Sequence, residues 1–264
     1  MIKISKILDG TLWAEEIAQK LSKGMRTNFY SAAEEFFPLI EAGEISRGIF
    51  DGGCYYLAEQ EGQINLFFFL EKEAAPVALP ELDKPVILEQ VATVRRGISP
   101  AAEEWERIGF QPYLQRKRLF LSQKNAAEEK RTVSFCEEGE GEEILRQMQA
   151  AFEPYTSALP DLATLRKDLR EHRVIAAREG ERLLGFLRFG REKKVSVLWQ
   201  IAVLPEGRGK GIGGRLVRDW LSLEREEVSK FQLWVREDNP PALKLYEASG
   251  FLPDGRIAPV MLKK

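Results

Sequence analysis

The sequence predicts an α/β protein with a mixed sheet, made of two related halves in tandem. Residues 132–264 alternate between segments that are apolar at every second position and segments with helical spacing, the patterns of strands and helices. Two segments of the first half match segments of the second half in the same order, which indicates an internal duplication. A glycine-rich loop, residues 207–214, joins a strand to a helix in the second half.

Composition indicates an ordinary globular chain. It has 264 residues, 44% of them hydrophobic, and a net charge of -2, which is enough for one large or two small cores. The charge gives no footprint for nucleic acid. No apolar run approaches the roughly 20 residues that span a bilayer, and the first residues lack the apolar region of a secretory signal. We expect a soluble cytoplasmic protein, monomeric or homodimeric, with neither nucleic acid nor membrane as a partner.

Cysteine and histidine are too few for several kinds of site. Cys54 and Cys136 lie far apart in unlike surroundings, so we expect reduced side chains rather than a disulfide or a zinc site. His172 is the single histidine and falls on a polar helical face. One histidine cannot assemble a metal cluster, and we expect no metal ion.

A charged segment divides the two halves. Residues 124–131 carry no apolar period, so the predicted domains are 1–123 and 132–264, with 124–131 as a linker. The second domain starts with a strand at 132–138, helices at 142–152 and 160–171, and strands at 173–179 and 182–192 paired around Gly180. Residues 195–203 form the next strand, which the spacing places with one face made of Val195, Val197, Trp199, Ile201 and Val203.

The remaining elements follow from helix and strand signals. Beyond the glycine loop, apolar residues recur at helical spacing from Ile212 to Leu223. Residues 230–238 alternate as a strand. Asn239, followed by two prolines, predicts the start of a helix that Gly250 ends. Residues 256–264 close the chain as a strand that Pro259 marks as an edge or a bulge.

The first half repeats parts of this order. Gly62 with its flanks matches Gly180, and the segment ending at Gly109-Phe110 matches the one ending at Gly250-Phe251. Between the matches, residues 73–85 contain neither a glycine loop nor a helix pattern.

The glycine loop predicts a phosphate site. Helix starts present unpaired N–H groups and partial positive charge, and glycines let phosphate oxygens approach them. Arg208 and Lys210 add positive charge. A P-loop is excluded because Lys210 is followed by Gly211 and Ile212 rather than by Ser or Thr. A dinucleotide fingerprint lacks the parallel alternation it needs around it.

The pattern Arg208-x-x-Gly211-x-Gly213 after a strand, with Asn239, Tyr246 and Gly-Phe on the next unit, resembles the GNAT superfamily of acyl-CoA-dependent N-acyltransferases. The resemblance covers about 132–264. It implies tandem GNAT-like domains, of which the first is truncated and lacks the pyrophosphate loop. It also implies that acetyl-CoA is the co-substrate.

The resemblance carries roles for particular residues. The loop would hold the CoA pyrophosphate, and the end of the strand 195–203 would diverge from its neighbour and expose main-chain groups to pantetheine, with an N–H near Val203 for the acetyl carbonyl. Tyr246 would protonate the departing thiolate or, alternatively, pack in the core. Asn239 would cap its helix, contact pantetheine, or both. The residues so implied in binding are Ile201, Ala202, Val203, Arg208, Gly209, Lys210, Gly211, Ile212, Gly213 and Asn239.

The base and the acceptor stay open. Gln200, where some relatives have an acid, cannot abstract a proton, and Glu237 and Asp238 are equally ordinary partners of a helix start. Direct attack of an amine on the thioester requires orientation rather than a nucleophilic residue. Polyamines, antibiotics, amino acids, peptide N-termini and protein lysines all stay open as acceptors.

The first half departs from the pattern, with Ile98 in the place of Asn239 and Trp105 in that of Tyr246. We expect it not to bind acetyl-CoA, and to be a packing partner or one wall of the acceptor site. The predicted function is an N-acetyltransferase with one active site per chain. The alternatives are an acyl-CoA-binding sensor without turnover and a phosphate-binding domain of another class.

Overall fold

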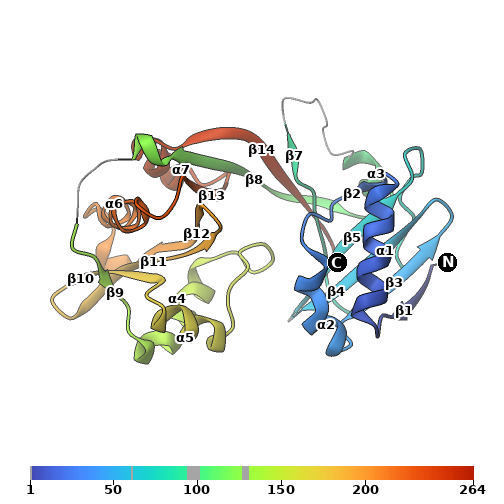
Figure 1. Ribbon diagram of the computed structural model, residues 1–264, viewed down its shortest axis with the longest axis horizontal. Helices are drawn as coiled ribbons and strands as arrows, with labels where there is room; N and C mark the ends of the chain where they lie inside the picture. The colour runs from blue at the N-terminus through green and yellow to red at the C-terminus, as the bar shows by residue number, and fades with distance from the viewer. Residues whose placement is uncertain (1, 61, 94–101, 127–130) are drawn as a thin grey trace. The chain divides into compact units, whose positions relative to one another are not determined.

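The computed structural model describes residues 2–60, 62–93, 102–126 and 131–264 (Figure 1). The chain forms two compact units. The first comprises Met1–Arg116 together with Arg256–Lys264, and the second comprises Lys117–Gly255. Both combine helices with a mostly antiparallel sheet, which confirms the predicted α/β class.

In the first unit the strand order is β1-β3-β4-β5-β6-β14. Asp9 starts the helix α1, because its side chain accepts a hydrogen bond from the Leu12 N–H at 3.0 Å. The elements are β1 (Lys3–Lys6), α1 (Gly10–Ser22), β2 (Arg26–Thr27), α2 (Phe37–Glu41), β3 (Ile45–Phe50), β4 (Gly53–Gln60), β5 (Gln63–Leu70), β6 (Val86–Glu89), β7 (Ala92–Thr93), α3 (Ala102–Glu106) and the start of β8 (Gln111–Ser122).

In the second unit the strand order is β8-β13-β12-β11-β10-β9. The predicted helices and strands are found close to their expected bounds. They are β9 (Ser134–Phe135), α4 (Gly141–Ala151), α5 (Leu162–Arg170), β10 (Val174–Glu179), β11 (Arg182–Glu192), β12 (Val195–Val203), α6 (Ile212–Glu224), β13 (Lys230–Arg236), α7 (Pro240–Ala248) and β14 (Leu252–Lys263).

The two units share one topology. In each, antiparallel strands lead to one parallel pair, β5 with β6 and β12 with β13. The sixth strand of each unit comes from the other half of the sequence, since β14 lies beside β6 and β8 lies beside β13. The last strands of the two halves are therefore exchanged.

The exchange explains why the compact units differ from the predicted domains. The chain passes between units within β8 and within β14, so residues 256–264 belong to the first unit. The described flanks of the segment 124–131 lie in the second unit, where Ala126 is buried and Arg131 donates to Asp219 of α6 at 2.6 Å.

One of the two matches between the halves is confirmed. Gly109 and Gly250 both have positive φ, 96° and 85°. The following phenylalanines donate to equivalent carbonyls, Phe110 to Trp105 at 3.1 Å and Phe251 to Tyr246 at 3.0 Å. The helix ends of α3 and α7 are therefore the same structure, with Trp105 in the place of Tyr246. Ile98 falls outside the described residues.

The other match is displaced by one hairpin. Gly62 turns β4 into β5, and β5 pairs in parallel with the next strand. Its counterpart by topology is β12, whereas the Gly180 turn leads into β11. A two-residue hairpin turn favours glycine wherever it occurs, so the local likeness does not identify the strand. Residues 71–85, which contain no helix, stand where the second unit has its glycine loop and α6.

A β-bulge corrects the predicted faces of β12. Arg188 of β11 pairs with Gln200 and Phe189 pairs with Leu198, so Trp199 is the extra residue. A bulge of one residue exchanges the faces beyond it. Leu198, Ile201 and Val203 therefore pack with the α6 core, and Ala202 packs with the α4 and α5 core.

Pro259 lies at an interruption in the pairing of β14. Arg256 and Ile257 pair with β7, and Val260–Lys263 pair with β6. Proline has no N–H to donate, but the Pro259 carbonyl still accepts from the Gln90 N–H at 3.1 Å.

Strand exchange predicts where a defect in β14 acts. Met261 is 4% exposed in the core of the first unit, whereas Leu252, on the same strand, is 59% exposed. Met261→Ala is expected to lower the free energy of unfolding by about 2–5 kcal/mol and to raise hydrogen exchange in β5 and α3. Leu252→Ala, the control, is expected to stay within about 0.5 kcal/mol. If hydrogen exchange in Met261→Ala became faster only in α6 and α7, the placement of the end of β14 in the first unit would be contradicted.

Candidate functional site

A cleft of about 680 Å³ opens in the second unit where β12, α6 and α7 meet. Its lining residues come from four places: the segment after α4, the end of β12, the glycine loop with the start of α6, and the end of β13 with the start of α7. They are Ala151, Phe152, Glu153, Ser157, Ile201, Ala202, Val203, Gly207, Arg208, Gly209, Gly211, Ile212, Gly213, Gly214, Arg236, Asp238, Asn239, Pro241, Ala242 and Leu245. All of the predicted binding residues except Lys210 are among them.

Two glycines set the path of the loop. Gly209 and Gly211 have φ of 74° and 73°, a region that other residues enter at a cost. Gly211 precedes the first residue of α6, and no side chain among the described residues caps that helix. A Cβ at either position would meet open space. The helix start therefore faces the cleft with nothing covering it.

Gly207 is required for a different reason. A Cβ there would lie 2.5 Å from the Leu184 carbonyl oxygen, so the loop can approach β11 only because this residue has no side chain. Gly209 and Gly211 are therefore required for the backbone conformation and Gly207 for close packing, a distinction that the sequence does not show.

The parallel strands β12 and β13 part beside the loop. Their ladder ends at the pair Leu198 and Leu233, while β12 runs on to Val203 and β13 to Arg236. We call residues 201–203, which line the cleft, and 234–236 the fork. The Leu204 N–H donates to the Leu184 carbonyl at 2.9 Å, so the alternation of an antiparallel ladder directs the main-chain groups of Val203 away from β11 and into the fork.

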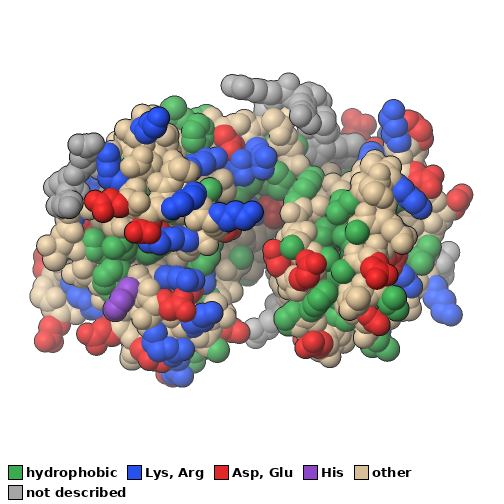
Figure 2. All heavy atoms as spheres, viewed as in Figure 1, with side chains coloured by type: hydrophobic (Ala, Val, Ile, Leu, Met, Phe, Trp, Pro, Cys, Tyr) green, Lys and Arg blue, Asp and Glu red, His purple; other side chains and the backbone are tan. Residues whose placement is uncertain are grey.

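The charges of the cleft are mostly compensated, with one exception. Arg236 holds Asp238 through two hydrogen bonds of 2.8 and 2.7 Å, which lower the pKa of that carboxyl. Lys210 lies 3.2 Å from Glu179. Arg208 has no ion pair within the described part of the chain. Lysine and arginine side chains are numerous on the face of the second unit that Figure 2 shows, and acidic side chains lie among them.

Asn239 combines a structural position with access to the cleft. Its side-chain oxygen accepts from the Ala242 N–H at 3.2 Å and caps α7. The predicted cap is confirmed, and a contact with pantetheine stays a prediction. Glu237 is not among the lining residues, whereas Asp238 is.

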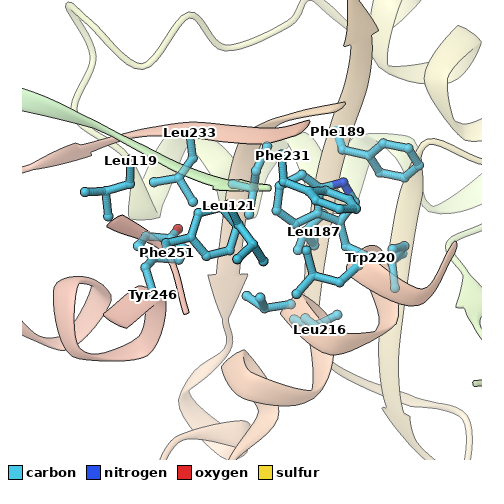
Figure 3. Close-up of a cluster of buried hydrophobic side chains, with 14 of the residues drawn as sticks. Leu119, Leu121, Leu187, Phe189, Leu216, Trp220, Phe231, Leu233, Tyr246 and Phe251 are labelled. Atoms are coloured by element: carbon cyan, nitrogen blue, oxygen red, sulfur yellow. The ribbon is translucent and has the colours of Figure 1, made fainter. Parts of the chain in front are cut away.

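Tyr246 lies in the core beside the cleft. Its side chain is 4% exposed and packs at 5.9 Å, between ring centroids, from Phe251 (Figure 3). Burial raises the pKa of its hydroxyl. Tyr246 does not line the cleft, but Ala242 and Leu245 of the same helix do. Its role as an acid stays a prediction.

The segment after α4 is the part of the site that the sequence did not indicate. Phe152, Glu153 and Ser157 line the cleft, but they follow no pattern of spacing. The main-chain N–H groups of Tyr155 and Thr156 donate to the Glu153 carboxylate at 2.7 and 2.9 Å, so the segment is folded around its own acid.

In the first unit the equivalent fork is filled by a side chain. The pairs of β5 and β6 end at Asn65 and Ile87. Beyond them the Asn28 amide donates to the carbonyls of Leu66 and Glu89 at 2.8 and 2.9 Å, and accepts from the Phe68 N–H at 2.8 Å. Asn28 is 6% exposed. One carboxamide thus satisfies main-chain groups on both strands, at the place that corresponds to the fork of the second unit.

The comparisons with known proteins agree with this geometry. Residues 141–251 match the sequence model of the acetyltransferase (GNAT) family. The predicted resemblance to this family is confirmed over these residues, which lie in the second unit. No helix in the described part of the chain is both long and apolar enough to cross a membrane.

Similarity to individual proteins is more limited. Mycothiol acetyltransferase of Brachybacterium faecium is 36% identical over 92 residues, which are 33% of this chain and 28% of that protein. The chain thus spans under a third of that relative's length. A GCN5-related N-acetyltransferase from Sphaerobacter thermophilus has a TM-score of 0.65 at 14% identity, covering 100% of this chain and 95% of its own.

A tandem GNAT protein from the clavulanic acid biosynthesis pathway has a TM-score of 0.59 at 11% identity, covering 99% of this chain and 98% of its own. At this identity the likeness concerns the fold alone. It supports the predicted tandem arrangement of GNAT-like domains.

The filled fork makes a prediction about stability. Asn28→Leu keeps a side chain of similar size but leaves three buried main-chain groups without partners. It is expected to lower the free energy of unfolding by about 2–4 kcal/mol, as measured by urea denaturation. Asn65→Ala, on β5 but bonded only to the side chains of Gln60 and Gln63, is the control. Equal losses of unfolding free energy in the two variants would contradict a particular stabilising role of the Asn28 hydrogen bonds.

Proposed function

We propose that the second unit binds acetyl-CoA in the cleft and transfers its acetyl group to a primary amine, with one active site per chain. The observation that carries the proposal is that the start of α6, which no described side chain caps, meets the point where β12 and β13 stop pairing with each other. A phosphate fits the first, and an extended chain with amide groups fits the second. Acyl-CoA donors contain both.

The loop would bind the pyrophosphate through two kinds of donor. The main-chain N–H groups of Arg208 and Lys210 already donate to Pro205 and Gly207, at 3.2 and 3.3 Å, so these residues would act through their side chains. Main-chain donation would come from Gly209, Gly211, Ile212 and Gly213. The ion pair of Lys210 with Glu179 is exposed and therefore weak, so Lys210 can turn to a phosphate.

The fork would bind the pantetheine arm. Ile201, Ala202 and Val203 line the cleft, and an amide-bearing arm can pair as an added strand with the main-chain groups of Ile201 and Val203 that point away from β11. Asn239 stands across the cleft at the start of α7. In the first unit the Asn28 side chain is bonded to main-chain groups at the equivalent place between β5 and β6, where a pantetheine arm would otherwise pair. This supports a single acyl-CoA site per chain.

The thioester supplies an activated acyl group when it is bound. The Val203 N–H, directed into the fork, would polarise the acetyl carbonyl, and an amine would attack the carbonyl carbon as the C–S bond breaks. Tyr246 would give its proton to the departing thiolate, which must reach it past Ala242 and Leu245. Water would take the proton that the attacking amine loses and return one to Tyr246, so that the products are the amide and the CoA thiol. The raised pKa of Tyr246 keeps its hydroxyl protonated throughout the physiological range.

A second candidate function rests on the absence of a placed base. Asp238 is held by Arg236, and Tyr246 lies outside the cleft lining. A domain that binds acyl-CoA without turnover, as a sensor, needs neither residue. The two functions share the binding site and differ in chemistry.

Binding is tested by closing the loop. Acetyl-CoA at about 100 times its dissociation constant should stabilise the protein by roughly 2.7 kcal/mol, which a thermal midpoint detects as a rise of a few degrees. Gly211→Trp should abolish the rise. Gly180→Trp is the control, because Gly180 also has positive φ (60°) and open space, at a hairpin outside the cleft. If acetyl-CoA still raised the thermal midpoint of Gly211→Trp, the proposed role of the loop in binding would be refuted.

Chemistry is tested at Tyr246. Tyr246→Phe preserves the packing in the core, so CoA binding should persist, while thiol release from acetyl-CoA in the presence of an amine panel should fall by roughly 10²–10⁴-fold. Because the pKa of the Tyr246 hydroxyl is raised, it should stay protonated at pH 9. Wild-type turnover should therefore not fall through its deprotonation up to that pH. Unchanged turnover in Tyr246→Phe would refute its role, and a wild type that binds but never turns over would favour the sensor.

A further inference from the structure

A buried polar chain crosses the second unit behind the cleft. The Arg188 guanidinium donates to Asp168 at 2.7 Å and to the Gln200 side-chain oxygen at 2.9 Å. All three side chains are nearly excluded from solvent, with exposed fractions of 6%, 3% and 2%. Asp168 lies on α5, Arg188 on β11 and Gln200 on β12, so the chain links three elements.

The chain ends on the segment that lines the cleft. The Gln200 amide donates to the Ser157 carbonyl at 2.8 Å and lies 3.4 Å from the Ala158 carbonyl. Ala158 has φ of 44°, a conformation that non-glycine residues adopt at a cost. The contact with Gln200 therefore holds the segment in a shape that it would not favour alone.

Gln200 is fixed before it meets the segment. Arg188 stacks over the Trp199 ring at 4.3 Å, and the bulge at Trp199 places Gln200 on the face of α4 and α5 rather than of α6. Since the oxygen of the carboxamide is bound by Arg188, its N–H₂ group must point to Ser157. The orientation of the amide is thus set by a charge that Asp168 holds in place.

We propose that Gln200 is a positioning residue that ties the segment 152–158 to β12 and so fixes the wall of the cleft left for the acceptor. The inference rests on the proposed function in one respect. There the donor takes the loop, the fork and Asn239, so that the wall formed by Phe152, Glu153 and Ser157 is the part that an acceptor would meet. Gln200 acts on that wall through the Ser157 carbonyl and touches neither substrate.

The test removes the hydrogen bond from Gln200 to the Ser157 carbonyl and keeps the one from Arg188 to Gln200. Gln200→Glu keeps its size and its acceptor for Arg188, but a carboxylate has no donor for the Ser157 carbonyl. Hydrogen exchange at the amides of Tyr155 and Thr156 is expected to become about fivefold to tenfold faster. The affinity for CoA, measured by calorimetry, is expected to stay unchanged, because the loop is not altered.

Ser196→Ala is the matched control. Ser196 lies on the same strand, is fully buried, and accepts from Trp220 of α6 at 2.9 Å, so its loss destabilises the unit without touching the segment. Exchange at 155 and 156 that is unchanged in Gln200→Glu, or raised equally in Ser196→Ala, would overturn the proposal. Exchange needs no ligand, so a wild type that fails to bind CoA would refute the proposed function and leave this result readable.

Discussion

The end of a parallel ladder is the constraint on which the rest of the second unit depends. Beyond Leu198 and Leu233 the strands β12 and β13 no longer pair, and main-chain groups inside a protein must find partners. The bulge at Trp199 lies at this point and turns the polar side of β12 toward α5. The glycine loop follows the end of β12, so the start of α6 and the end of β12 line one cleft.

The first unit meets the same constraint with a side chain. Asn28 bonds to main-chain groups of β5 and β6 where those strands part, and residues 71–85 contain no helix whose start could face the gap. With the same topology, the gap between the parallel strands is filled by Asn28 in the first unit, whereas in the second unit the corresponding gap opens onto the cleft. The difference lies in one buried amide and one glycine loop, while the helix ends at Gly109 and Gly250 remain alike.

Polar groups in the second unit are arranged to leave the cleft both open and rigid. Asp168, Arg188 and Gln200 satisfy one another and the Ser157 carbonyl, which offsets part of the cost of burying them. Arg236 neutralises Asp238 at the rim. Arg208, by contrast, carries a charge without an ion pair in the described residues, and a phosphate would supply its counterion.

The sequence by itself determined the elements of the second half, since periodicity, the Asn239 cap and the glycines depend on local geometry. It also determined where the glycine loop lies, because a run of glycines before a helical pattern is a local feature of the sequence. Only the tertiary structure decided which strand lies beside which: β8 and β14 are exchanged, and strand alternation does not name a neighbour. The bulge moved Ile201 and Val203 to the other face, the Asn28 contacts join residues far apart in the sequence, and the wall at 152–158 depends on Gln200, 43 residues from Ser157. Such contacts leave no periodic trace in a chain, because they are set by packing between elements.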